Sequence, residues 1–361
     1  MKGFLKGIGI LLLVIVLALA LLIGYLTVTA LNPETETASL SEPGAYSTGT
    51  LSDGDSFSIV SWNIGYGSLG KESDFFMDGG EQSRPENQQI VDKNIAGIIE
   101  QLRPDDKDWL ADFMLLQEVD SGSKRSYGVV ETDAIAQGVG FTSAYALNYK
   151  SAFVPVPPTA PLGKVTSGVF TLASTPVTDA ARIALPSPFK WPVSTVNLKR
   201  CLLVTRVPLQ DSDRELVLVN LHLEAYDDGE GKIAQTKALM GFLKDEFEKG
   251  NYVIAGGDFN QTFPGALEQY PVKNTELWTP GVLNESDLPG EGWQFVTDLS
   301  TPTCRLLNEP YDPASANTQY YVIDGFIVSP NVRVDAVETV NAQFEFSDHN
   351  PVLMNVTLLA Q

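Results

Sequence analysis

The sequence has few of the residues on which several common kinds of site depend. Its 361 residues include two cysteines, two histidines, and 24 lysines and arginines against 45 aspartates and glutamates. Two cysteines exclude a disulfide-framework fold and a zinc module with several cysteine ligands. Two histidines are too few for a site built on three, and a net charge of −21 argues against a basic face for nucleic acid or anionic lipid. Chemistry in this chain must therefore depend mainly on oxygen ligands.

A long apolar segment follows the N-terminus. Lys2 and Lys6 precede it, and the 23 residues from Ile8 to Ala30 are nearly all apolar. At about 1.5 Å per residue, this segment can cross a hydrocarbon core of about 30 Å, whereas a signal peptide usually has a shorter apolar region. The positive-inside rule then keeps the N-terminus in the cytoplasm. We expect residues 1–30 to anchor an extracytoplasmic domain in the cell membrane by a single pass. Cleavage after Ala30, as in a signal peptide, is the alternative.

The composition changes after this segment. Residues 31–56 are rich in Pro, Ser, Thr, Gly and acids without apolar periodicity, which predicts a flexible acidic tether. Residues 57–361 contain no Gly- or Pro-rich linker, so we expect one domain there. Two segments, Asn87–Leu102 and Lys232–Lys249, have the apolar spacing of amphipathic helices. Apolar runs predict strands at Phe57–Trp62, Phe113–Gln117, Val169–Ala173, Cys201–Val207, Leu216–Leu221, Tyr252–Ala255, Tyr321–Val328 and Val352–Thr357.

Polar side chains stand at the ends of these apolar runs. A single strand-end Asn or Asp is usually a cap or turn residue, and an Asp inside an apolar run needs a partner to be buried. In this chain, polar residues stand at the ends of several apolar runs, and both histidines of the chain are among them. This joint placement favours one site at the strand ends. Its members are Asn63, Glu118, His222, Asp258, Asn260, Asp324, Asp348 and His349. The proline-rich segment Phe153–Leu162 is expected on the surface near this site.

The motifs around these residues also follow a recognisable order. They are Ser61-Trp62-Asn63-Ile64-Gly65, Gln117-Glu118-Val119, Ser167-Gly168 with Ser174-Thr175-Pro176, Asn220-Leu221-His222, Gly257-Asp258-Phe259-Asn260, Ile323-Asp324-Gly325 and Ser347-Asp348-His349-Asn350-Pro351. Over about residues 57–358 this set resembles the endonuclease/exonuclease/phosphatase superfamily. The resemblance implies an α/β fold, a four-layer α/β/β/α sandwich with two mostly antiparallel sheets. It also implies a metal-dependent hydrolase of phosphate esters.

The resemblance assigns a metal site to three of these residues. Glu118 would supply the main carboxylate ligand, with Asn63 and Asp348 nearby. Such hard oxygen ligands suit Mg²⁺, and also Mn²⁺ or Ca²⁺.

The resemblance gives the other five residues catalytic roles. Asp324 would pair with His349 and orient its imidazole. Asp258 would position the attacking water, and Asn260 would donate to a phosphoryl oxygen. His222 would contact the phosphate or protonate the leaving group.

We therefore expect a monomeric, membrane-anchored phosphodiesterase, with two alternatives. One is an extracellular endonuclease, and the other is an inactive surface binding domain on the same fold. No stripe of basic residues with interleaved aromatics marks a nucleic-acid groove, so nucleic acid is not favoured. A phospholipid headgroup and another small phosphodiester remain open as substrates. Lys164, Arg200 and Arg305 are either anion contacts or ordinary surface charges.

The sequence differs from the family pattern at two places. Gly325 stands where many members have Tyr after the Asp, which changes the wall of the site. Residues 261–264, Gln-Thr-Phe-Pro, differ from the pattern of inositol polyphosphate phosphatases, which argues against that activity.

Overall fold

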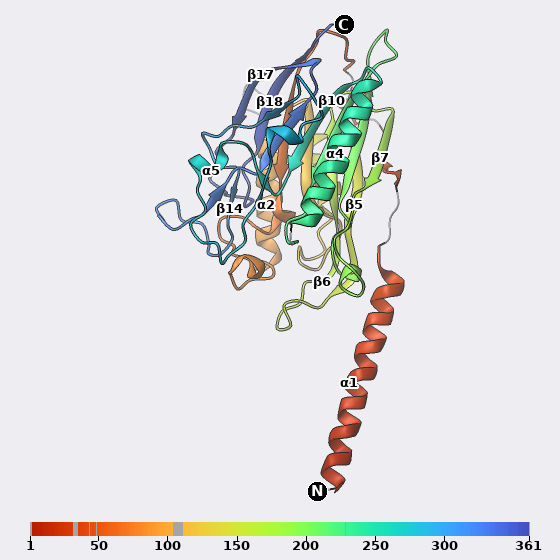
Figure 1. The fold of residues 1–361 in the computed structure, drawn as a ribbon, viewed down its shortest axis with the longest axis vertical. Helices are drawn as coiled ribbons and strands as arrows, with labels where there is room; N and C mark the ends of the chain where they lie inside the picture. The colour runs from red at the N-terminus through yellow and green to blue at the C-terminus, as the bar shows by residue number, and fades with distance from the viewer. Residues whose placement is uncertain are drawn as a thin grey trace.

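Two seven-stranded sheets form the centre of the structure, and one long helix precedes them (Figure 1). The computed structural model describes residues 2–31, 35–42, 44–47, 49–103, 111–227 and 229–360. The helix α1 (Lys2–Thr29) extends away from the sheets along the long axis of the molecule (Figure 1). Its residues Gly3–Thr29 are long and apolar enough to cross a membrane, with a mean hydropathy of 3.1.

The first sheet has the order β1-β7-β8-β9-β10-β16-β13. The pair β9–β10 is parallel, and the neighbouring pairs are antiparallel. Its strands are β1 (Glu36–Thr37), β7 (Asp179–Ala184), β8 (Cys201–Pro208), β9 (Glu215–His222), β10 (Tyr252–Asp258), β16 (Asp324–Val328) and β13 (Gln294–Val296).

The second sheet has the order β17-β18-β3-β4-β6-β5-β2. The pair β3–β4 is parallel, and the neighbouring pairs are antiparallel. Its strands are β17 (Val332–Thr339), β18 (Val352–Leu358), β3 (Ser56–Asn63), β4 (Phe113–Asp120), β6 (Gly163–Ala173), β5 (Thr142–Val154) and β2 (Ser39–Leu40).

The two sheets pack face to face and are covered by helices on their outer faces. The core between them joins Ile59 and Leu115 of the second sheet to Leu218 and Ile254 of the first. Strands buried on both faces need apolar residues at successive positions, which explains the continuous apolar runs of the sequence. The helices α2 (Gln88–Leu102) and α3 (Glu131–Val139) pack on the second sheet, and α4 (Glu230–Glu248) packs on the first. The expected α/β/β/α layers are confirmed.

Each predicted helix and strand is present, two expectations need correction, and β5, β7, β13, β17 and α3 are further elements that were not predicted. The run Tyr321–Val328 is interrupted: β15 (Tyr320–Tyr321) pairs with β14 (Cys304–Arg305), and Asp324 is the first residue of β16. The segment expected as a flexible tether over residues 31–56 is partly built into the domain. β1 pairs with β7, β2 pairs with β5, and Leu51 is buried. Backbone pairing offsets the polar composition of this segment, so that expectation is corrected for the described residues 35–42, 44–47 and 49–56.

Gly257 lets β10 approach β9 closely. Its φ is +152°, and a Cβ at this position would lie 1.9 Å from the carbonyl oxygen of Leu221. Because backbone cannot move aside cheaply, Gly257→Ala should destabilise the full-length chain by about 3 kcal/mol in chemical unfolding. Gly241 in α4 is the matched control, since a Cβ there meets nothing within 4 Å. Gly241→Ala should stabilise by about 0.5–1 kcal/mol. Equal effects of the two substitutions would contradict this packing.

Candidate active site

Strand register brings three of the predicted residues together in the first sheet. At the end of β10, Asp258 is opposite His222 of the parallel β9 and opposite Asp324 of the antiparallel β16. Neighbouring parallel strands end at the same sheet edge, whereas an antiparallel neighbour begins there. One edge therefore collects side chains from residues 222, 258 and 324.

The second sheet contributes Asn63 and Glu118 to the same place. The Asn63 Nδ2 donates to Asp258 Oδ2 at 3.0 Å and to Glu118 Oε1 at 3.4 Å, so this amide links the two sheets. Glu118 lies at a bulge between Leu116 and Val119 and has a φ of +54°. Bulges redirect side chains, and backbone outliers held by the surrounding structure are frequent at functional sites. The Glu118 side chain is 24% exposed.

A buried amide pair fixes the two sheets directly beneath this cluster. Gln117 Nε2 donates to Asn220 Oδ1 at 2.9 Å, and Asn220 Nδ2 donates to the carbonyl oxygens of Leu116 and Phe170. Both amide side chains are fully buried. These hydrogen bonds between the sheets specify one arrangement of the residues around them, although Gln117 Oε1 has no partner among the described residues. The spacing of Glu118 from His222 is thereby held by the residues that precede them.

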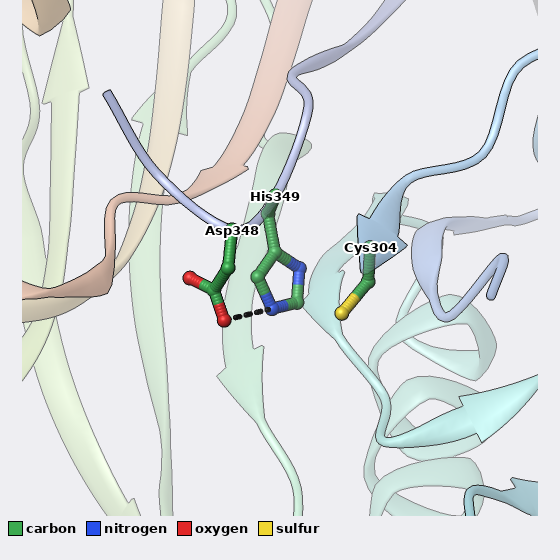
Figure 2. Close-up of side chains that lie close together, drawn as sticks. All are labelled: Cys304, Asp348 and His349. Carbon is green, nitrogen blue, oxygen red and sulfur yellow. Dashed lines mark ion pairs between the residues drawn. The ribbon is translucent and has the colours of Figure 1, made fainter. Parts of the chain in front are cut away.

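The segment before β18 supplies Asp348 and His349. Ser347 Oγ donates to the Asn63 carbonyl oxygen at 2.7 Å, and the Trp62 indole donates to the His349 carbonyl oxygen at 2.8 Å. Figure 2 shows that the His349 imidazole lies between the Asp348 carboxylate and the Cys304 thiol. Its Nε2 is 3.9 Å from Asp348 Oδ2.

His349 is held as a cation by a buried carboxylate. Its Nδ1 lies 2.8 Å from Asp324 Oδ2, and the Asp324 side chain is fully buried. Burial lowers the pKa of His349, but the charges of Asp324 and Asp348 and the Asp324 hydrogen bond raise it well above its ordinary value. The predicted pairing of residues 324 and 349 is present in the structure. It places a fixed positive charge at the site.

His222, the other histidine, has a lowered pKa, in contrast to His349. Burial, then the positive charges of Arg200, His349 and Arg125, lowers the pKa of His222 well below its ordinary value. Its Nε2 is 3.4 Å from Asp258 Oδ2, and its Nδ1 has no hydrogen-bond partner among the described residues. These surroundings favour the neutral imidazole of His222.

Asp258 has the character of a base for neutral pH. Burial, followed by the charge of Asp324, raises its pKa to about 7, while His349 and the hydrogen bonds from Asn260 N and Asn63 oppose the rise. A general base works best when its pKa lies near the working pH. Asn260 N donates to Asp258 Oδ1 at 2.8 Å, and Asn260 Nδ2 donates to the Leu223 carbonyl oxygen at 2.9 Å. The second N–H of that amide is available to a ligand.

The donor set of Glu118, Asp348 and Asn63 fits a hard divalent cation. Burial raises the pKa of Asp348 to about 6, and the Glu118 charge adds to the rise although His349 opposes it. A cation beside both carboxylates would relieve this repulsion. The absence of a side chain at Gly65 leaves space beside the Asp348 carboxylate, since a Cβ there would lie 3.0 Å from Asp348 Oδ1.

Two further clusters of possible ligands adjoin His349, but their chemistry is less suitable for such an ion. They are Cys304, Asp348 and His349, and Asp258, Asp324 and His349. A protonated imidazole has no lone pair to give to a metal. Burial raises the pKa of the Cys304 thiol to about 12 despite His349, so it stays protonated. Cys304 and Cys201 are both buried free thiols, so they do not form a disulfide with each other.

These residues open into a cavity of about 500 Å³. Seven of the eight predicted residues line it, and Asp324 lies behind His349. The proline-rich segment was expected near the site, and Val154, Val156 and Leu162 of this region do line the cavity.

The three candidate anion contacts lie in different surroundings. Arg200 is buried in the cavity wall, 3.7 Å from Glu224 Oε2, and its Nε and Nη1 have no hydrogen-bond partner in the described chain. Arg305 is instead a structural residue, although it reaches the wall: its guanidinium donates to the carbonyl oxygens of Gly70, Ser73 and Glu309. Lys164 is exposed on β6. Arg200 is therefore the best candidate of the three for an anion contact.

Comparison with known proteins identifies the family of the chain. Residues 60–349 match the model of the Endonuclease/Exonuclease/phosphatase family. A search of curated protein sequences found no match.

Solved structures share the fold at low sequence identity. A protein of this family from Beutenbergia cavernae is 17% identical with a TM-score of 0.55, over 84% of this chain and 72% of that one. ANGEL2, a 2′,3′-cyclic phosphatase, is 14% identical with a TM-score of 0.54, over 90% of this chain and 99% of that one. A family protein from Bacteroides thetaiotaomicron is 13% identical with a TM-score of 0.52, and the match covers 85% of this chain and 100% of that one.

Proposed function

Because the chain belongs to the endonuclease/exonuclease/phosphatase family, we propose that it is a membrane-anchored, Mg²⁺-dependent phosphodiesterase. One observation carries the proposal: acids, amides and two histidines from both sheets converge on a single cavity. Hydrolysis of a phosphate ester needs charge neutralisation at the phosphoryl oxygens, a nucleophile made from water, and help for the leaving oxygen. The convergent residues offer all three.

Glu118 and Asp348, with Asn63, would hold the divalent cation. When bound, this ion would neutralise charge on the phosphoryl oxygens. Mg²⁺ is the proposed ion because carboxylate and amide oxygens suit it, and Mn²⁺ or Ca²⁺ can use the same ligands.

Asp258 would take a proton from water as the water oxygen forms its bond to phosphorus. The ester P–O bond breaks in the same displacement, and the leaving oxygen acquires a proton from solvent or a neighbouring acid. Asn63 and Asn260 N hold the Asp258 carboxylate in position through the hydrogen bonds described above.

The two histidines would act on the phosphoryl group in different ways. The His349 imidazolium, fixed by Asp324, stabilises negative charge that develops on the phosphoryl oxygens. His222, being neutral, can donate an N–H hydrogen bond to one of those oxygens. Protonation of the leaving group by His222 would require a bound anion to raise the pKa of His222, since burial and the nearby positive charges keep it low.

Residues 1–30 would anchor the catalytic domain, residues 57–361, on the extracytoplasmic side. The candidate span Gly3–Thr29 has 27 residues, none of its most apolar window is buried, and Lys2 and Lys6 lie at its N-terminal end. This length exceeds the apolar region of an ordinary signal peptide, and the lysines favour a cytoplasmic N-terminus.

The proposal is tested by turnover of bis(p-nitrophenyl) phosphate by the full-length chain in detergent with Mg²⁺. We expect release of one p-nitrophenolate per p-nitrophenyl phosphate formed. In ¹⁸O-labelled water the phosphate product should carry one ¹⁸O, because water attacks phosphorus. Label in the phenol, or no turnover with any divalent cation, would contradict the proposed reaction.

A further inference from the structure

Part of the cavity is lined mainly by apolar side chains, unlike the cluster at the strand ends. Its lining comes largely from the connection between β5 and β6 and from the segment before β8. The apolar side chains of these two segments are Val154, Val156, Leu162, Phe189, Val193, Val196 and Leu198. Val193 remains 52% exposed and Val156 remains 42% exposed. A phosphate group gains nothing from such a surface, whereas a hydrocarbon group gains by burial there.

The same end of the domain contacts the membrane-spanning candidate α1. Trp191 Nε1 donates to Thr27 Oγ1 at 3.0 Å, and Leu26 of α1 is buried. Trp191 is 63% exposed and Tyr25 of α1 is 55% exposed. Trp and Tyr are enriched where membrane proteins meet the lipid headgroups, so this pair marks the level of the membrane surface. The cavity mouth at Val193 lies only two residues along the chain from Trp191.

The connection between β5 and β6 projects toward the same level. Figure 1 shows this loop leaving the end of the domain nearest α1 and extending along the molecule's long axis to the height of α1's C-terminal turns. Residues 155–162 of this loop contain Val156 and Leu162 of the mouth. A membrane crossed by α1 would therefore meet this loop before the rest of the domain.

The charge distribution favours the same orientation. Residues 121–200 carry eight Lys and Arg and three Asp and Glu, whereas the whole chain carries 24 Lys and Arg and 45 Asp and Glu. Arg125, Arg182 and Arg200 of this segment are buried, so its five lysines supply the accessible positive charge. Lys150, Lys164 and Lys190 of this segment are exposed. A basic segment is attracted to anionic lipid headgroups, whereas the acidic remainder of the domain is repelled.

Resting on the proposed phosphodiesterase activity, we propose that the substrate is a lipid phosphoester from the membrane that α1 crosses. Its phosphate reaches the cluster at the strand ends, and its hydrocarbon part lies along Val156, Leu162 and Val193. The reaction is the hydrolysis given above, so no additional reactant is needed. The membrane anchor then serves to hold the cavity mouth at the substrate's own surface.

The test compares two p-nitrophenyl phosphodiesters that differ only in the second ester group, methyl or dodecyl. The full-length chain is reconstituted in vesicles of phosphatidylcholine and phosphatidylglycerol with Mg²⁺. We expect kcat/KM to be at least about tenfold higher for the dodecyl ester, since burial of about two methylene groups suffices for this factor. Both esters release p-nitrophenolate, so the chemistry of the leaving group is constant.

A pair of variants separates binding at the mouth from simple partitioning of the dodecyl ester into the vesicles. Val193→Asp should lower the dodecyl-to-methyl ratio by about tenfold, because it places a charge against the hydrocarbon chain. Val282→Asp is the matched control: Val282 in β12 (Gly281–Val282) is 49% exposed and does not line the cavity. The control should keep the ratio of the unchanged chain.

Four results would overturn the lipid inference, and they have different consequences for the proposed phosphodiesterase activity. Equal kcat/KM for the two esters, or equal ratios in the two variants, would overturn this inference and leave the phosphodiesterase in place. A higher kcat/KM for an oligonucleotide than for the dodecyl ester would do the same and identify a nuclease. No turnover of any ester would overturn the proposed function itself.

Discussion

Replacement of Glu118 by glutamine should lower kcat/KM for phosphodiester hydrolysis by about 10³-fold or more. A bound cation contributes several kcal/mol of charge stabilisation, and each 1.4 kcal/mol is a factor of ten in rate. Glutamine keeps the shape of the side chain but removes the negative charge that would hold the ion. The Glu118 carboxylate accepts one long hydrogen bond in the described chain, from Asn63, so little structural bonding is lost.

The same substitution should also raise the Mg²⁺ concentration needed for half-maximal rate. Glu268→Gln is the matched control, since Glu268 is an exposed carboxylate in α5 (Ala266–Gln269) that does not line the cavity. It should retain both the rate and the Mg²⁺ dependence of the unchanged chain. Thermal unfolding of both variants shows that the fold is kept. Near-normal turnover by Glu118→Gln would contradict the proposed metal site.

Asp324→Asn should lower kcat/KM by about 10²-fold or more by removing the partner of His349. Asp324 is the largest of the influences that raise the pKa of His349 against its burial. Without this carboxylate the pKa should fall, so the imidazole becomes neutral at a pH where it is now charged. The site then loses its fixed positive charge near the phosphoryl oxygens.

The chain's two histidines make this change directly measurable by NMR titration of the imidazoles. In the unchanged chain one imidazole should stay protonated through neutral pH and the other should stay neutral. In Asp324→Asn the first should lose its proton at lower pH. Asp112→Asn is the control. Asp112 directly precedes β4, at the end of this strand away from Glu118, and its carboxylate accepts a hydrogen bond from Ser58 N at 2.9 Å. It should leave both imidazoles and kcat/KM unchanged, and an unshifted His349 in Asp324→Asn would contradict the assigned pairing.

The site was more predictable than the sheets that carry it. Apolar runs that end in acids or histidines show where strands stop, and the register then places residues 222, 258 and 324 side by side. Strand β5 was not predicted because buried and partly exposed residues alternate in Thr142–Leu147, which leaves no continuous apolar run. The pairing of β1 with β7 and of β2 with β5 was also missed, because two-residue strands carry no periodic signal.

The sequence also did not show which charged side chains are buried. Arg305 and Arg200 are equally plausible as surface charges in the sequence, yet both are buried. Arg305 bonds backbone carbonyls, whereas Arg200 faces the cavity. Long-range packing decides which carbonyl or cavity a guanidinium meets, and no local pattern encodes it. The same holds for Cys304, which reaches His349 through an antiparallel bridge between distant segments.

The most direct test is the Mg²⁺ dependence of bis(p-nitrophenyl) phosphate hydrolysis by the full-length chain. The chain is treated with EDTA, assayed, and assayed again as Mg²⁺ is added back. If Glu118, Asp348 and Asn63 hold a catalytic cation, hydrolysis should cease with EDTA and return with Mg²⁺ in a saturable way. Hydrolysis that continues at the full rate in EDTA would contradict the metal-dependent phosphodiesterase.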